Sequence, residues 1–345
     1  SQGTTSLWKV TAEGSDRTIY LGGSIHILGE DDHPLPPAFE SAYRASDELV
    51  LEIATSQEPG SDTIALEKGM YGNKGKISDD LSIEMYKKLV NYLKDNDLPE
   101  TAMDGFRPWM ASMTISITEI MKLGGRPDLG VDTFFEGKAV EDKKIVSALE
   151  TTEFQIGLFT KLSKEDQEKM LASTLKEVVT IEEDFPRMVT AWRNGDDKTI
   201  EKIINESMIG SPDFRKELLD KRNKNWAVKI NEFMKEDRDK MVIVGAAHLV
   251  GDKGLVKLLR DSGLKVKRWK SKKKKDEKDR DREEGPRPVQ ISTPREATES
   301  RPMEQSSGKP LGDPRLEFGP TKADARAKTL TFQESQSVSV PPLPM

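Results

Sequence analysis

Residues 19–26 read IYLGGSIH, and residues 241–248 read MVIVGAAH. Each stretch is an apolar run typical of a strand, followed by Gly-x-x-His, and the two copies contain His26 and His248, two of the chain's three histidines. Glycine lets the backbone turn tightly or approach a ligand closely, and open sheets commonly form their sites at strand ends. The repeat therefore predicts a functional pair of histidines, as metal ligands or general bases. The alternative is that both rings only hydrogen-bond backbone carbonyls at strand ends.

Strand patterns lie toward both ends of the first 270 residues, and helical patterns fill the middle. A hairpin is predicted over residues 7–21, and the nearly continuous apolar run 48–54 is typical of a strand buried on both faces. Together these patterns predict an α+β fold, with a central sheet formed by strands from both ends of this region and a long helical segment between them in the sequence. Further strands are predicted at 143–149, 240–244 and 264–269. Helices are predicted at 37–44, 81–93, 109–123 and 151–162. Four or so more helices fill 164–234, including one at 214–234, and another helix ends near 259.

Three charged residues stand in or beside apolar patterns. Glu52 lies inside the 48–54 run, where a carboxylate is costly unless it is paired, protonated or bound to a metal. Glu150 ends another apolar run and could equally face solvent. Arg222 lies on the apolar stripe of the predicted helix 214–234, so we expect it to point inward, unless its stem packs and its head stays at the surface. A buried cation would be the natural partner of Glu52.

The composition and the missing motifs exclude several classes of protein. The 345 residues are 33% charged and include no cysteine, so disulfides, thiolate metal sites, iron–sulfur clusters and cysteine nucleophiles are excluded. No apolar run approaches the roughly 18 residues of a transmembrane helix. H-E-x-x-H, P-loop, G-x-S-x-G and G-x-G-x-x-G motifs are absent, which disfavours common zinc proteases, nucleotide phosphatases and α/β-hydrolases. His33, in an Asp-Asp-His-Pro loop, is expected to have no special role.

The chain divides near residue 270 into two parts of different composition. Residues 271–345 hold 10 of the 19 prolines and no tryptophan, so we expect a disordered tail that cannot bury enough apolar surface to order itself. Residues 1–270 carry 39 basic and 47 acidic residues, a net charge of −8, which argues against nucleic acid as a partner. Because the chain begins at Ser1 without an initiator methionine, we expect that an upstream segment was removed, either an export signal or an expression artefact.

Several motifs in order resemble the TraB/GumN family, which is similar to the Tiki metalloproteases and more distantly to erythromycin-esterase-like and ChaN-like haem-binding proteins. The resemblance covers residues 5 to 270. It rests on Leu7-Trp8-Lys9-Val10, the first Gly-x-x-His, Pro34-Leu35-Pro36, the strand with Glu52, Gly130-Val131-Asp132, Leu149-Glu150-Thr151, Gln155, Arg222-Asn223 with Trp226, and the second Gly-x-x-His followed by Leu249-Val250-Gly251.

The resemblance implies an α+β fold in which two pseudo-symmetric strand-plus-Gly-x-x-His units bring both histidines to one cleft. Glu52 and Arg222, which the residue patterns single out, match polar positions of the family, and Asp132 and Glu150 also match with less definite roles. Family relatives imply metal-dependent peptide cleavage with manganese or cobalt, ions that two histidines and carboxylates suit. The resemblance also favours an exported protein of the periplasm, cell envelope or exterior.

The leading hypothesis is a metal-assisted hydrolase that acts on a peptide or small-molecule substrate. His26 and His248 would bind the metal or activate water, with Glu52 as ligand or general base and Glu150 as a further candidate ligand. Arg222 would hold Glu52 in place or stabilise the oxyanion. Two alternatives stay open: a metal-free esterase with His26 as general base, and a non-enzymatic envelope protein that binds haem or another small ligand through the same histidines.

Overall fold

The computed structural model describes residues 3–207 and 212–270, and the tail predicted over residues 271–345 lies outside them. The described residues contain a six-stranded sheet with the strand order β4-β3-β5-β2-β1-β6. The predicted α+β fold with a central sheet and a long helical middle is confirmed. The strands are β1 (Thr4–Thr11), β2 (Thr18–Ser24), β3 (Glu48–Leu51), β4 (Ile145–Ala148), β5 (Lys240–Gly245) and β6 (Lys265–Lys270).

The two Gly-x-x-His units follow neighbouring parallel strands. β2 pairs with β5 in parallel, with Gly23 opposite Val244, and β3 and β4 continue the parallel arrangement beyond β5. β1 forms the predicted hairpin with β2 and pairs on its other side with β6, antiparallel in both cases. Because β2, β5, β3 and β4 run in the same direction, their carboxyl ends meet at one edge of the sheet.

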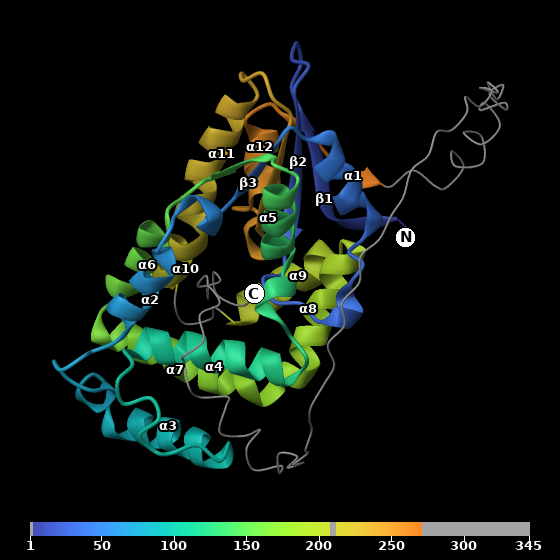
Figure 1. The fold of residues 1–345 in the computed structure, drawn as a ribbon. Coiled ribbons are helices and arrows are strands. Elements are labelled where there is room, and N and C mark those ends of the chain that lie inside the picture. Colours follow the sequence, from blue (N-terminus) through green and yellow to red (C-terminus); the bar gives the residue numbers. More distant parts are fainter. Residues whose placement is uncertain (1–2, 208–211, 271–345) are drawn as a thin grey trace, which may run out of the picture. The chain divides into compact units, whose positions relative to one another are not determined.

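Helices fill the middle of the chain, as the apolar spacing predicts. α4 packs along α7, and α3 packs against α7, in the lower part of Figure 1 away from the strands. The helices are α1 (Pro37–Ala45), α2 (Ser61–Gly69), α3 (Ile83–Asp95), α4 (Pro108–Lys122), α5 (Val131–Glu141), α6 (Thr152–Thr160), α7 (Lys164–Glu177), α8 (Ile181–Asn194), α9 (Asp197–Ser207), α10 (Pro212–Arg215), α11 (Lys221–Phe233) and α12 (Leu255–Asp261).

Side-chain caps explain where two of these helices begin. The Ser82 hydroxyl accepts a hydrogen bond from the backbone N–H of Met85 and starts α3. The Thr151 hydroxyl accepts a hydrogen bond from the backbone N–H of Phe154 and starts α6. No helix among the described residues is both long and apolar enough to cross a membrane.

The structure differs from the sequence prediction at two points near the site. β3 ends at Leu51 instead of running to residue 54, because the chain turns into the short helical segment Thr55–Gln57. Glu52 therefore lies just past a strand end and not inside a strand. The helix predicted at 214–234 starts at Pro212 and contains a π-helical turn at Lys216–Asp220, two residues before Arg222. The sequence pattern does not predict α2.

Candidate functional site

His26 and His248 lie at the same edge of the sheet, beyond the carboxyl ends of β2 and β5. Their exposed fractions are only 5% and 3%. The motif glycines allow this close approach: a Cβ at Gly245 would lie 3.1 Å from His26 Nε2, and a Cβ at Gly23 would lie 3.3 Å from Ala246 Cα. The glycine of each unit leaves room for the other unit, which gives a physical reason for its presence in both copies.

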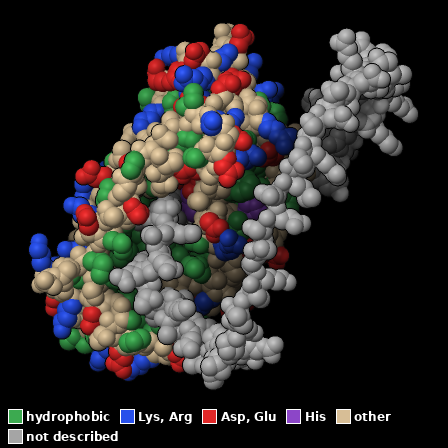
Figure 2. Space-filling model, in the orientation of Figure 1, with side chains coloured by type: hydrophobic (Ala, Val, Ile, Leu, Met, Phe, Trp, Pro, Cys, Tyr) green, Lys and Arg blue, Asp and Glu red, His purple; other side chains and the backbone are tan. Residues whose placement is uncertain are grey.

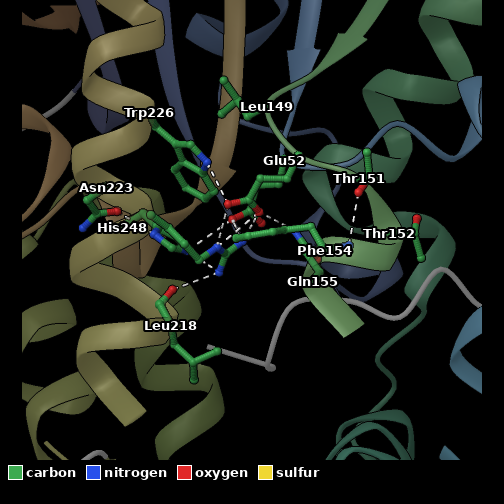
Figure 3. A network of polar contacts seen from close by, with 12 residues as sticks. Glu52, Leu149, Thr151, Thr152, Phe154, Gln155, Leu218, Asn223, Trp226 and His248 are labelled. Atoms are coloured by element: carbon green, nitrogen blue, oxygen red, sulfur yellow. Dashed lines mark hydrogen bonds and ion pairs between the residues drawn. The ribbon is translucent and has the colours of Figure 1, made fainter. Parts of the chain in front are cut away.

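Glu52 lies between the two histidines with its carboxylate buried. Oε1 is 3.2 Å from His248 Nε2, and Oε2 is 3.7 Å from His26 Nε2. Oε2 has no hydrogen-bonding partner among the described residues. Burial alone would raise the pKa of Glu52, but His248, Arg222 and His26 together outweigh it and lower the pKa to about 2. The carboxylate is therefore ionised at neutral pH, and Figure 3 shows it pointing toward His248.

The guanidinium of Arg222 is buried and has acceptors on all three nitrogens. Nε donates to Glu150, and Nη2 donates to Glu150 at 2.8 Å and to Glu52 at 3.3 Å. Nη1 donates to the backbone carbonyl of Leu218 at 2.9 Å and lies 3.4 Å from His248 Nε2. These contacts place Arg222 where it can hold Glu52 in position.

Glu150, the further candidate ligand, is surrounded by donors. Oε1 accepts from Arg222 Nε and from Trp226 Nε1, each at 3.0 Å. Oε2 accepts from Arg222 Nη2 at 2.8 Å and from Gln155 Nε2 at 3.1 Å. These four contacts engage both oxygens, and in this arrangement Glu150 fixes Arg222.

Asn223 sets the orientation of the His248 ring. Its Nδ2 donates to the backbone carbonyl of Lys253 at 2.9 Å, which leaves Oδ1 to accept from His248 Nδ1 at 2.6 Å (Figure 3). Nδ1 therefore carries a proton, and Nε2 faces Glu52 and Arg222. Burial lowers the pKa of His248, and Glu52 opposes this shift. One face packs on Trp226, with 4.4 Å between ring centroids.

Asp132 has the corresponding position at His26. Its Oδ2 lies 3.1 Å from His26 Nδ1, and its Oδ1 accepts from the Ser24 hydroxyl at 2.9 Å. Burial alone would lower the pKa of His26, but Asp132 and Glu52 outweigh it and raise the pKa above its ordinary value. Gly130 permits this contact, since a Cβ there would lie 2.0 Å from the His26 backbone oxygen. The 130–132 motif therefore supplies both the glycine that lets this segment approach the His26 backbone and the carboxylate that contacts the His26 ring.

A cavity of about 880 Å³ opens beside His26. Its walls come from α4, α7, α8 and α9, together with the segment that follows β2. Histidine side chains are visible within a hollowed part of the face shown in Figure 2. A ligand in this cavity would therefore contact His26, while Glu52 lies behind it.

Some features of these side chains fit a divalent transition metal, and others do not. Two imidazoles and a carboxylate are ligands that such ions accept, and Asn223 orients His248 as an outer-shell group does. The unpartnered Glu52 Oε2 also fits a cation. Against a metal, the positively charged Arg222 already contacts Glu52 Oε1. Over residues 3–207 and 212–270, no group of three or more His, Asp or Glu side chains is arranged to hold a metal ion.

Two parallel strand-plus-Gly-x-x-His units that share one buried glutamate define the class: an α+β protein with a two-histidine centre at a sheet edge. The model of the TraB/PrgY/gumN family matches residues 6–268, and the chain belongs to this family. The uncharacterized protein YbaP of Escherichia coli (strain K12) is 26% identical over 257 residues, which are 73% of this chain and 90% of that protein. YbaP of Shigella flexneri, also uncharacterized, matches to the same extent. No solved structure matches the chain.

The structure brings together the side chains that the sequence patterns single out, and adds one. His26, Glu52, Glu150, Arg222 and His248 form a continuous series of contacts, and Asp132, implied by the resemblance, joins it at His26. Asn223 had no assigned role. A buried amide beside Arg222 on the inward face of a helix is the feature that could have indicated it.

Proposed function

We propose that this chain is a hydrolase that cleaves an amide or ester, with His26 and Glu52 in contact with the attacking water. One observation supports this above all: two buried imidazoles converge on one ionised, buried carboxylate, and one of them, His26, lines a cavity. Burying such groups together brings little stability, and clusters of perturbed titratable groups in clefts are typical of functional sites. A peptide bond is one such amide.

The proposed water lies beside His26 and Glu52. His26 Nε2 and Glu52 Oε2 are 3.7 Å apart, and Oε2 has no hydrogen-bonding partner among the described residues, so one water beside them can contact both atoms. His26 takes a proton from this water as the oxygen attacks the carbonyl carbon. It then gives the proton to the leaving nitrogen or oxygen as the bond to carbon breaks. Asp132 stabilises the imidazolium formed between the two steps.

Three other residues position this pair. Arg222 holds Glu52 Oε1, which leaves Oε2 facing His26, and Glu150 fixes Arg222. Asn223 keeps His248 Nε2 directed at the same carboxylate. A reaction that depends on alignment within fractions of an ångström needs such support.

We include in the proposal that His26, Glu52 and His248 can hold a divalent transition metal, manganese or cobalt. When bound, such an ion would polarise the carbonyl and lower the pKa of a coordinated water. The unpartnered Glu52 Oε2 and the position of His248 Nε2 beside the same carboxylate support this version. Both Nε2 atoms must be unprotonated for binding, so metal affinity is expected to rise with pH.

The position of Arg222 supports a metal-free version of the same reaction. A guanidinium that contacts Glu52 and lies 3.4 Å from His248 Nε2 gives the centre a permanent cation of its own. His26 then acts as the general base, without a metal.

Metal content and turnover, measured on the same preparations, test these versions. Wild type, the double variant His26→Ala/His248→Ala and the control His33→Ala are purified without chelator and analysed by plasma mass spectrometry. His33 is the matched control because it is the remaining histidine and contacts the Leu129 carbonyl instead of the centre. Each protein is then assayed against acyl esters and peptides, with and without manganese or cobalt.

Each outcome supports one version or rejects the hydrolase. Near-stoichiometric metal in wild type and His33→Ala, absent from the double variant, supports the metal-assisted version. Turnover that needs His26 but no metal supports the metal-free version. No turnover of any ester or peptide under either condition contradicts a hydrolase, and a Soret band on adding haem would then assign the histidines to ligand binding.

A further inference from the structure

We infer that the cavity beside His26 binds one extended apolar chain of the kind found in fatty-acyl esters and amides. Placing the acyl carbonyl at His26 rests on the proposed function, whereas binding of the chain does not. The volume of about 880 Å³ lies within the roughly 300–1,000 Å³ typical of small-molecule sites. The walls show which chemistry the cavity selects.

Several of the lining side chains are apolar and buried. Ile25 and Ile27 flank His26 in the sequence, and their exposed fractions are 3% and 1%. Ile120 of α4 and Met188 of α8 contribute at 2% and 5%. Water gains no hydrogen bonds from these side chains, so they suit an apolar ligand better than a polar one.

Charged and exposed side chains line a different part of the same cavity. The exposed fractions of the Lys169, Asp184 and Glu206 side chains are 53%, 44% and 56%. Val179, 81% exposed, lies among the lining residues. Their exposure marks them as the mouth. The change from a wet, charged mouth to a dry inner wall suits an amphiphilic ligand whose chain lies inside.

The secondary structure of the walls favours an acyl chain over a peptide. None of the described residues that line the cavity belongs to a strand. An extended peptide must satisfy its own N–H and C=O groups, commonly against a sheet edge, whereas helices use their backbone groups internally. A hydrocarbon chain makes no such demand, so the helical walls can accept it without unsatisfied polar groups.

Binding of cis-parinaric acid, a fatty acid whose fluorescence rises in apolar surroundings, tests the inference on the full chain. Ala172→Phe fills the cavity from α7, and Val179→Lys places a charge at its mouth. Val228→Lys is the matched control for the second variant, because Val228 is 64% exposed on α11 and is not a lining residue. Thermal unfolding of each variant shows whether it folds.

We expect saturable binding of one probe per chain. Ala172→Phe and Val179→Lys should each weaken it by about ten-fold or more, whereas Val228→Lys should change it by less than about two-fold. Absence of saturable binding to wild type would overturn the inference, as would unchanged binding in both cavity variants when they fold normally. Displacement of the probe by a blocked apolar peptide but not by palmitate would assign the cavity to peptides instead.

Hydrolysis of p-nitrophenyl esters of increasing acyl length separates this inference from the proposed function. We expect faster cleavage of long-chain esters, with the preference lost in Ala172→Phe. Probe binding without cleavage of any ester would reject the hydrolase and leave the binding site standing. Cleavage of acetyl esters with no chain-length preference and no probe binding would reject the acyl-chain site alone.

Discussion

Glu150 and Arg222 form a two-point contact: Oε1 accepts from Nε at 3.0 Å, and Oε2 accepts from Nη2 at 2.8 Å, with both side chains almost fully buried. Arg222 in turn donates to Glu52. A carboxylate that follows β4 therefore determines, through an arginine on α11, where a second carboxylate lies beyond β3. The geometry of the proposed reaction depends on a residue outside the reacting groups.

Removing the charge of Glu150 should weaken this arrangement. In Glu150→Gln, Arg222 stays buried without one of its two counter-charges, and an amide NH₂ group faces its N–H groups, so we expect a loss of about 3 kcal/mol in the free energy of unfolding. Urea denaturation measures it. Glu153→Gln, at an exposed position on α6, is the control and should stay within about 0.5 kcal/mol of wild type. A Glu150→Gln loss no larger than the control's would contradict the role of Glu150.

The pKa of His26 should lie above that of an ordinary histidine, and the pKa of His248 should lie below it. Asp132 and Glu52 overcome burial and raise the pKa of His26, whereas burial lowers the pKa of His248. With only three histidines in the chain, nitrogen-15 NMR can follow each ring, and His33→Ala removes the third signal. Protonation of His248 at a higher pH than His26 would disprove this assignment.

Asn223→Asp should raise the pKa of His248. The new carboxylate at Nδ1 stabilises the imidazolium, so the ring gains a proton at higher pH than in wild type. The same NMR titration measures the shift. Asn225→Asp, at an exposed position on the same helix, adds an equal charge away from the ring and should move the pKa much less. Equal shifts in both variants would show that Asn223 does not control the ring.

Alanine substitutions at two glycines, one at the start and one in the middle of α5, should change the free energy of unfolding in opposite directions. In Gly130→Ala the new Cβ would lie 2.0 Å from the backbone oxygen of His26, so the loss of stability should be at least about 3 kcal/mol. In Gly137→Ala nothing lies within 4 Å, and the variant should gain about 0.4–1 kcal/mol. Unfolding free energies of both variants check this. A stable Gly130→Ala protein would mean that the 130–132 motif is free to move away from His26.

Glu48 should make folding stability depend on acid pH at the opposite edge of the sheet. Burial alone would raise its pKa, but Lys240, Ser147 and Arg238 outweigh burial and lower the pKa below its ordinary value of 4.5. A carboxylate with a lowered pKa stabilises the fold above that ordinary value and loses the contribution as pH falls through the folded pKa. The stability difference between wild type and Glu48→Gln should therefore shrink below pH 4.5, as urea denaturation at several pH values can show. A difference that stays constant with pH would refute the pairing.

Local sequence was sufficient to predict several elements of the fold and site. The apolar content of residues 18–21 and 240–244 predicts strands because it reflects short-range side-chain burial. Helical periodicity predicted that Arg222 points inward, with a head at the surface as the alternative, and the side chain is buried. Glu52 stood out because an ionised carboxylate in an apolar run needs a partner nearby. The end of β3 was less predictable, since an apolar run does not show where the chain turns.

The sequence by itself determined the type of most elements and the identity of most polar groups, since both depend on neighbours within a few residues. Only the tertiary structure decided that β2 and β5 are adjacent, that Asn223 rather than a carbonyl orients His248, and that four helices leave a cavity at His26. These relationships join residues far apart along the chain. Which distant groups meet depends on how all the apolar faces pack at once, and no local pattern contains that information.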